Sequence, residues 1–146
     1  MISKALHIRL ATGNDEDTVY RMICDLENKT LNRTSFNHVF HRNLSNDYIC
    51  YLIAELNGAP VGMGSCHVQP LLHHVSMVAE IQEMYVQADY RSMEIGKALV
   101  EQLVVFAKSK AASQIEVTSN NMREHAHRFY QKEGFQKSHV KLVRYF

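Results

Sequence analysis

The sequence predicts an α/β (α+β) fold in which one domain, residues 1–146, contains a central mixed, mostly antiparallel sheet of six to seven strands flanked by about four helices. The spacing of apolar residues changes repeatedly between two, typical of strands, and about 3.6, typical of helices. The predicted order is one strand, two helices, three strands, a helix, a strand, a helix and one or two final strands. No repeat or linker interrupts this order, which favours a single domain.

The N-terminal third is predicted to form a strand and two helices. Apolar and polar residues alternate over residues 6–10, as they do in a half-buried strand. Asn14 or Asp15 can cap the helix that follows, and apolar residues recur at helical spacing as far as Leu26. Apolar residues spaced four apart predict a second helix from Thr34 to Leu44.

The middle of the chain is predicted to form three strands. Tyr48–Leu56 and Val61–Val68 have the composition of strands, and the Asn-Gly pair at 57–58 is a two-residue hairpin signal. Pro70 is expected to break the second of these strands, because proline cannot donate a backbone hydrogen bond. A longer strand, Val75–Val86, is predicted to follow.

The C-terminal third is predicted to contain a buried strand, a short helix and the last strands. The buried strand is Gln114–Ser119. Asn120 or Asn121 can cap the short helix, and Gly134 is expected to end it. Phe135–Phe146 is predicted to supply one or two final strands.

The segment from Glu80 to Gly96 is predicted to pass from a strand through a tight turn into the start of a long helix. The first turn of a helix leaves backbone N–H groups unpaired, and together they favour an anion such as phosphate. The alternative is an ordinary strand-to-helix junction in which Gly96 relieves close packing.

The composition is that of an ordinary globular protein, with 46% hydrophobic and 21% charged residues. A net charge of +1 provides no strong field to hold nucleic acid or an anionic membrane. Three widely spaced cysteines, no N-terminal apolar signal and no apolar run of about 20 residues lead us to expect a reduced, cytoplasmic protein. The sequence leaves open whether the protein forms a homodimer.

Two motifs indicate a family. Residues 91–98 read RSMEIGKA at the start of the long helix, and residues 126–135 read AHRFYQKEGF. In this order the chain resembles the GNAT family of acetyl-CoA-dependent N-acetyltransferases over nearly its whole length. A narrower likeness, to bacterial aminoalkylphosphonate N-acetyltransferases, rests on residues 73–75, 80–83 and 121–130. The resemblance implies the GNAT fold, acetyl-CoA as cosubstrate and acetyl transfer to a small amine.

The resemblance also implies which residues hold acetyl-CoA. In the family the fourth strand splays from the fifth, the pantetheine pairs with its exposed backbone, and an N–H such as that of Val86 polarises the thioester carbonyl. One departure is Glu94, which stands where the family usually has glycine; its N–H is expected to serve the phosphate while its carboxylate faces solvent. The expected cofactor-binding residues are Met84, Tyr85, Val86, Arg91, Ser92, Met93, Glu94, Ile95, Gly96, Lys97 and Asn121.

Acetyl transfer to an amine requires a general acid and a path for the amine's proton. Tyr130 is the expected acid, because the family has a tyrosine here and a phenol of pKa near 10 can protonate a thiolate. The alternative is that Tyr130 only packs. Glu80 is the expected general base, through water, and Glu83 competes for that role. Alternation along the strand puts these two carboxylates on opposite faces unless a bulge intervenes.

Phosphonate binding would require cations, and we expect His74 and Arg128 to contact the substrate. No metal site is predicted, because adjacent histidines on a strand point to opposite faces and His125 and His127 lack the i, i+4 spacing of a helical zinc site. A weaker divalent ion that bridges substrate and carboxylate stays open. The cations available for the phosphonate are Arg33, Arg42, His67, His74 and Arg128.

Two alternative functions were weighed. The first is the same chemistry on another small amine, such as a polyamine, an antibiotic or an amino acid. A polyamine site should be lined with carboxylates, whereas basic groups gather in the predicted substrate loops. The second is a DNA-binding transcriptional regulator, against which the low net charge and the lack of a helix-turn-helix pattern argue. The sequence does not identify the preferred amine.

Overall fold

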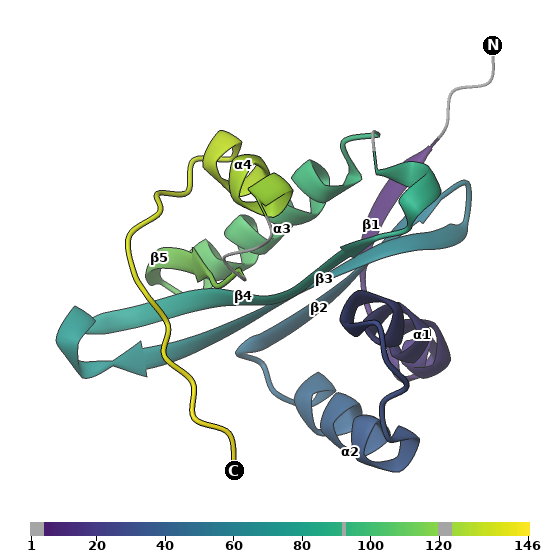
Figure 1. Ribbon diagram of the computed structural model, residues 1–146, viewed down its shortest axis with the longest axis horizontal. Coiled ribbons are helices and arrows are strands. Elements are labelled where there is room, and N and C mark those ends of the chain that lie inside the picture. Colours follow the sequence, from purple (N-terminus) through teal and green to yellow (C-terminus); the bar gives the residue numbers. More distant parts are fainter. Residues whose placement is uncertain (1–4, 92, 120–123) are drawn as a thin grey trace.

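A five-stranded sheet crosses the whole protein in the computed structural model, which describes residues 5–91, 93–119 and 124–146 (Figure 1). The strands lie side by side in chain order, the first four antiparallel and the fifth parallel to the fourth. They are β1 (Leu6–Leu10), β2 (Ile49–Leu56), β3 (Ala59–Leu71), β4 (Ser76–Val86) and β5 (Ala112–Val117).

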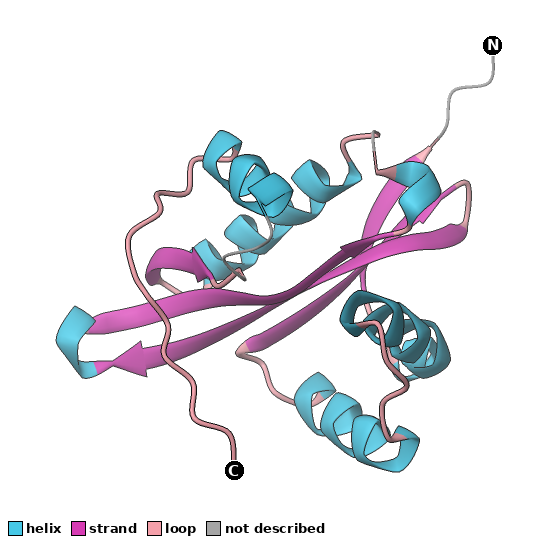
Figure 2. Cartoon of the chain, in the orientation of Figure 1, coloured by secondary structure: helices cyan, strands magenta, loops and turns pink. Residues whose placement is uncertain are grey.

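Helices cover both faces of the sheet, with α1 and α2 on one face and α3 and α4 on the other (Figure 2). Among the described residues, no helix is both long enough and apolar enough to cross a bilayer. The helices are α1 (Glu16–Glu27), α2 (Arg33–Leu44), α3 (Ile95–Ser109) and α4 (Glu124–Lys132), and short 3₁₀ turns lie at Gly13–Asp15, Leu72–His74 and Ala88–Tyr90.

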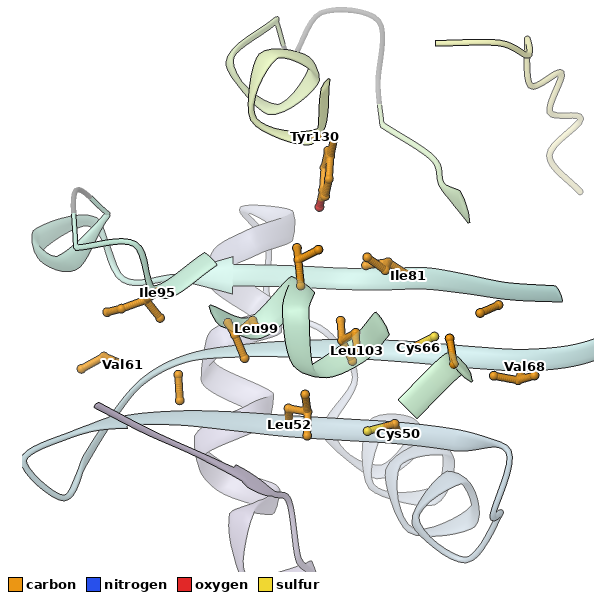
Figure 3. Close-up of a cluster of buried hydrophobic side chains, with 14 of the residues drawn as sticks. Cys50, Leu52, Val61, Cys66, Val68, Ile81, Ile95, Leu99, Leu103 and Tyr130 are labelled. Atoms are coloured by element: carbon orange, nitrogen blue, oxygen red, sulfur yellow. The ribbon is translucent and has the colours of Figure 1, made fainter. Parts of the chain in front are cut away.

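Each face of the sheet has its own hydrophobic core. On one side, Leu99 and Leu103 of α3 are fully buried against Ile81 and other strand residues (Figure 3). On the other side, Phe40 of α2 and residues of α1 cover Met63. Each fully buried apolar side chain of this size stabilises the fold by roughly 1.5–3 kcal/mol. Because strand residues point alternately to the two faces, β4 contributes to both cores.

The predicted fold class is confirmed, but the predicted count of six to seven strands is wrong. The described residues form five strands, and Phe135–Phe146 forms neither strand nor helix. A strand needs a neighbour for its backbone groups, and this segment has none in the described chain. The expected buried strand Gln114–Ser119 is instead β5, which is half-exposed because it lies at the edge of the sheet.

The predicted effect of Pro70 is also wrong. β3 continues to Leu71, with Pro70 paired to Met77 on β4. The pairing of β3 with β2 ends at His67, so Pro70 has a strand neighbour on one side and its missing N–H breaks no ladder. The predicted hairpin is confirmed, because Asn57 and the glycine after it both have the positive φ that such a turn requires.

A partly buried ion pair connects β1 to the start of α1. Arg9 donates two hydrogen bonds of 2.8 Å to the Asp15 carboxylate, which also accepts the N–H of Thr12 at 2.7 Å. Asp15 is only 7% exposed. These hydrogen bonds, that from Arg9 above all, lower the pKa of Asp15 below its ordinary value.

We expect Asp15→Asn to lower the free energy of unfolding by about 2–3 kcal/mol at pH 7, because it leaves Arg9 without its buried charge partner. Urea denaturation measures this difference, and Asp47→Asn at an exposed position should change it by less than about 0.5 kcal/mol. Because the folded pKa is lowered, the contribution of Asp15 is present above the unfolded pKa of about 3.9 and is lost as the pH falls further. A difference that does not shrink below pH 4 would contradict this assignment.

Candidate functional site

A β-bulge interrupts β4 near its middle. Between two matched pairs, β4 has one residue more than β3, so that Gln82 and Glu83 together lie opposite Ser65. The side chain of Ser65 is fully buried and is bonded in both directions: its oxygen accepts the N–H of Glu83 at 2.9 Å, and its hydroxyl donates to the Glu83 carboxylate. A bulge bends a strand and increases its twist, so β4 changes direction here.

The parallel strands β4 and β5 separate just after this bulge. Their pairing ends at Ile81, whereas β4 continues to Val86. The N–H of Gln87 donates to a carbonyl of β3 at 2.8 Å. Since successive backbone groups point to opposite sides of a strand, the N–H and C=O groups of Met84 and Val86 face the opening between β4 and β5. The opening therefore offers a row of free backbone groups.

A cavity of about 160 Å³ lies at this opening. Tyr130 points into it from α4 toward β4 (Figure 3) and is 9% exposed, with Phe129 and Phe135 packed edge-on against its ring. At about 30 Å³ for each water molecule, the space suits a small polar group and not a whole cofactor. Its lining residues are Leu26, Glu27, Ile81, Gln82, Met84, Val117, Thr118, Ser119, Ala126 and Tyr130.

Two polar residues of this lining, Glu27 and Gln82, are absent from the sequence predictions. Glu27 is the last residue of α1, and the sequence does not show that this helix ends beside the β4–β5 opening. Gln82 stands between the two carboxylates singled out from the sequence, which is the one signal that could have identified it. The cavity wall therefore combines an acid from α1, an amide from β4 and a phenol from α4.

The bulge decides the positions of the two candidate bases. Ile81 belongs to the core under α3, so its neighbour Glu80 faces the other side of the sheet. The extra residue turns Glu83 to that same side, where it meets Ser65, so the two carboxylates share a face. Glu80 accepts a hydrogen bond of 2.7 Å from the side chain of Gln82. Glu80 is thus connected to the cavity through a residue that lines it.

Tyr85 lies on the opposite side of β4 from the cavity. Its hydroxyl donates to the carboxylate of Asp25 on α1, and burial together with Asp25 raises the pKa of Tyr85 to about 12. The alternation that directs Met84 to the opening directs the backbone of Tyr85 to β3. Tyr85 therefore anchors α1 to β4 and presents neither its side chain nor its backbone to the opening.

The first turn of α3 has no side chain that caps it, so its backbone N–H groups are open. Glu94, just before it, has a left-handed φ of 59° and an exposed side chain. This conformation favours glycine. A Cβ on Gly96 would lie 3.2 Å from the ring of Phe129, so this glycine also permits close packing of α4. Arg91 donates from Nε to the carbonyl of Val86 at 2.9 Å.

The other predicted site residues are less closely connected. Met93 and Lys97 are exposed at the start of α3, and Ser92 and Asn121 lie outside the described residues. His74 lies in the turn between β3 and β4, 4.0 Å from Glu116. Arg128 is exposed on α4, with Nη2 2.8 Å from Nδ1 of His125. His74 and Arg128 thus lie on different elements, and each has its own polar neighbour.

Arg33, one of the candidate cations, already has a structural role. It forms ion pairs of 3.0 and 3.1 Å with Glu16 and Asp17, which connect α2 to α1. In the part of the chain that the structure describes, no group of three or more His, Cys, Asp or Glu residues is placed to hold a metal ion.

Comparison with known sequences identifies the family. The profile of the acetyltransferase (GNAT) family matches residues 16–135. The aminoalkylphosphonate N-acetyltransferase of Salmonella typhimurium is 37% identical over 137 residues, which cover 94% of this chain and 89% of that protein.

Solved structures show the same fold. The crystal structure of a transcriptional regulator from Bacillus halodurans C-125 is 25% identical and has a TM-score of 0.89, covering 97% of this chain and 100% of that one. Aminoglycoside N-acetyltransferase AAC(6')-Iy in complex with CoA also has a TM-score of 0.89, at 14% identity, covering 99% of this chain and 97% of that one. The chain therefore belongs to the GNAT family and is an acetyl-CoA-dependent N-acetyltransferase.

Proposed function

We propose that this enzyme transfers the acetyl group of acetyl-CoA to the amine of a small aminoalkylphosphonate by direct attack on the thioester. The observation that carries the proposal is the 37% identity to the Salmonella aminoalkylphosphonate N-acetyltransferase, which extends over 94% of this chain and 89% of that protein. The open backbone of β4 beside Tyr130 and the uncapped start of α3 support the same chemistry.

We propose that acetyl-CoA binds along β4 and at the start of α3. The pantetheine would pair with the backbone of Met84 and Val86, in the place that β5 leaves open. The pyrophosphate would accept hydrogen bonds from the first-turn N–H groups of α3, near Arg91. The exposed carboxylate of Glu94 can turn to solvent, so it need not approach the phosphates. Gly96 would keep this approach free of a side chain.

In the proposed reaction the amine nitrogen attacks the thioester carbon, and the C–S bond breaks. The N–H of Val86 would stabilise the negative charge that develops on the carbonyl oxygen. Tyr130 would donate its proton to the departing thiolate. Glu80 would accept the ammonium proton through water, at the end of the link that Gln82 forms. His74 and Arg128 are the proposed cations for the phosphonate.

The proposal is tested by the rate of thiol release from acetyl-CoA with a panel of amines. We expect kcat/KM for 2-aminoethylphosphonate to exceed that for ethylamine by about tenfold or more, because a charge-assisted contact to the phosphonate contributes about 1.5 kcal/mol or more. A carboxylate of the same length, β-alanine, separates recognition of phosphonate from recognition of any anion. Each rate is measured with a divalent ion and with a chelator. A polyamine or aminoglycoside that is the best substrate would contradict the proposal.

We expect Tyr130→Phe to lower kcat by about 10²-fold or more, because the variant keeps the ring between Phe129 and Phe135 and loses only the acidic hydroxyl. The melting temperature should change little, and it is measured beside the rate. Phe135→Leu, which alters packing on the same ring without touching the hydroxyl, is the matched control. If Tyr130→Phe keeps full turnover, Tyr130 is a packing residue.

We expect the rate defect of Glu80→Gln to be largest near neutral pH and to shrink as the pH rises. An alkylamine has a pKa near 10.4, so at neutral pH most of it must lose a proton before it attacks, whereas near that pKa solvent has already removed the proton. Glu116→Gln, in register with Glu80 on β5, is the control and should show no such trend. A defect that is constant across pH would transfer the base role to Glu83 or to water.

We also propose that the enzyme works in the cytoplasm. Its three cysteines are free, and Cys50 and Cys66 are buried, which raises the pKa of these thiols to about 11 and about 12. Such thiols are neutral and unreactive, and free cysteines suit a reducing compartment.

A further inference from the structure

We propose that two copies of this chain associate by exchanging their C-terminal arms, residues 136–146, each arm adding a strand to the open edge of the other copy's β5. The proposal does not depend on the identity of the acceptor amine. The arm begins just after Phe135, whose N–H donates to the carbonyl of Tyr130 at 2.9 Å and whose ring packs on that tyrosine. Beyond this anchor the arm forms neither helix nor strand.

The arm has the sequence of a strand and the exposure of an unpaired one. Apolar and polar residues alternate from Ser138 to Leu142, as in a strand with one buried face. Leu142 is 92% exposed and Phe146 is fully exposed. A monomeric protein rarely leaves such a dense apolar segment in water. The large apolar residues that the arm exposes are Val140, Leu142, Val143, Tyr145 and Phe146.

The edge that would receive the arm is open. β5 ends the strand order, and in the described chain no strand lies on its outer side. Its outward N–H and C=O groups are therefore free to pair with an added strand. The eleven residues 136–146 can span about 36 Å when extended, and the six residues of β5 span about 20 Å, so one arm is long enough.

The course of the arm points to a second copy as the partner. Figure 1 shows the arm leaving α4, running past the sheet and ending well away from β5 of its own chain. A chain with both a free strand and a free strand edge is self-complementary, and reciprocal exchange about a two-fold axis satisfies both and closes the assembly. The sixth strand that the sequence predicts would then come from the partner.

The charges of the two surfaces are complementary. The arm contains Lys137, Lys141 and Arg144 and no acidic residue. On the receiving side, Glu116 of β5 lies in register with Glu80 of β4, so two carboxylates lie side by side near the edge. Opposite charge on the arm and the edge fixes which surfaces meet and favours association at low salt.

The first test is the mass of the protein in solution, measured by sedimentation equilibrium. We expect twice the chain mass of 16.8 kDa for the natural sequence and the single-chain mass for Leu142→Glu, which places a carboxylate on the apolar face of the arm. Val140→Glu should act in the same way, and circular dichroism verifies that both are folded. Leu72→Glu, at a position 98% exposed in the β3–β4 turn, is the matched control and should stay dimeric. A monomeric natural protein, or arm variants that stay dimeric, would overturn the proposal.

The second test separates exchange between chains from pairing within one chain. Unlabelled and isotope-labelled chains, each with a photoreactive benzoylphenylalanine in place of Tyr145, are refolded together, irradiated and digested. We expect crosslinks from the arm to the peptide that contains residues 112–117, with roughly half of them joining a labelled to an unlabelled chain, as random pairing in a two-fold dimer requires. Crosslinks to this peptide that always join the same isotope would show that the arm pairs with its own β5, and the exchange would be wrong.

Discussion

The hydrogen bonds between Ser65 and Glu83 are the interaction on which the rest of the site depends. They satisfy a buried hydroxyl and a strand N–H at the point where β4 carries one residue too many. A regular β4 would pair with β5 to its end and close the opening beside Met84. Without the hydroxyl, the Glu83 groups would be left unsatisfied at a cost of about 1–3 kcal/mol each. The bulge therefore exists because a small buried donor and acceptor stabilises it.

Beyond the bulge, the two faces of β4 have different tasks that are mechanically connected. Met84 faces the cavity side, while Tyr85, one residue on, is bonded to Asp25 of α1 on the other face. The same helix ends at Glu27, which lines the cavity. A contact in one core thus sets the position of a polar group in the wall of the cavity. Since packed interiors deform little, a change at Tyr85 reaches the cavity through α1.

Much of this architecture could be predicted from the sequence because it is local. The hairpin at 57–58, the stripe of α3 and the strand-to-helix junction each follow from a short pattern, and the motif around Tyr130 identifies the family. The face occupied by Glu83 could not be predicted, because a bulge depends on the register of two strands and no local pattern marks it. The same holds for Glu27, which reaches the cavity through the packing of α1 across the sheet.

Glu94 and the C-terminal arm show the limit of local patterns from opposite directions. At Glu94 the chain adopts a left-handed conformation that costs a residue with a side chain about 1 kcal/mol or more. The surrounding turn imposes it, because it directs the first N–H groups of α3. In residues 136–146 the local preference is clearly that of a strand, yet no strand forms within the described chain, because a strand is defined by its neighbour. Sequence states what a segment prefers, and the surrounding structure decides whether that preference is overridden or satisfied.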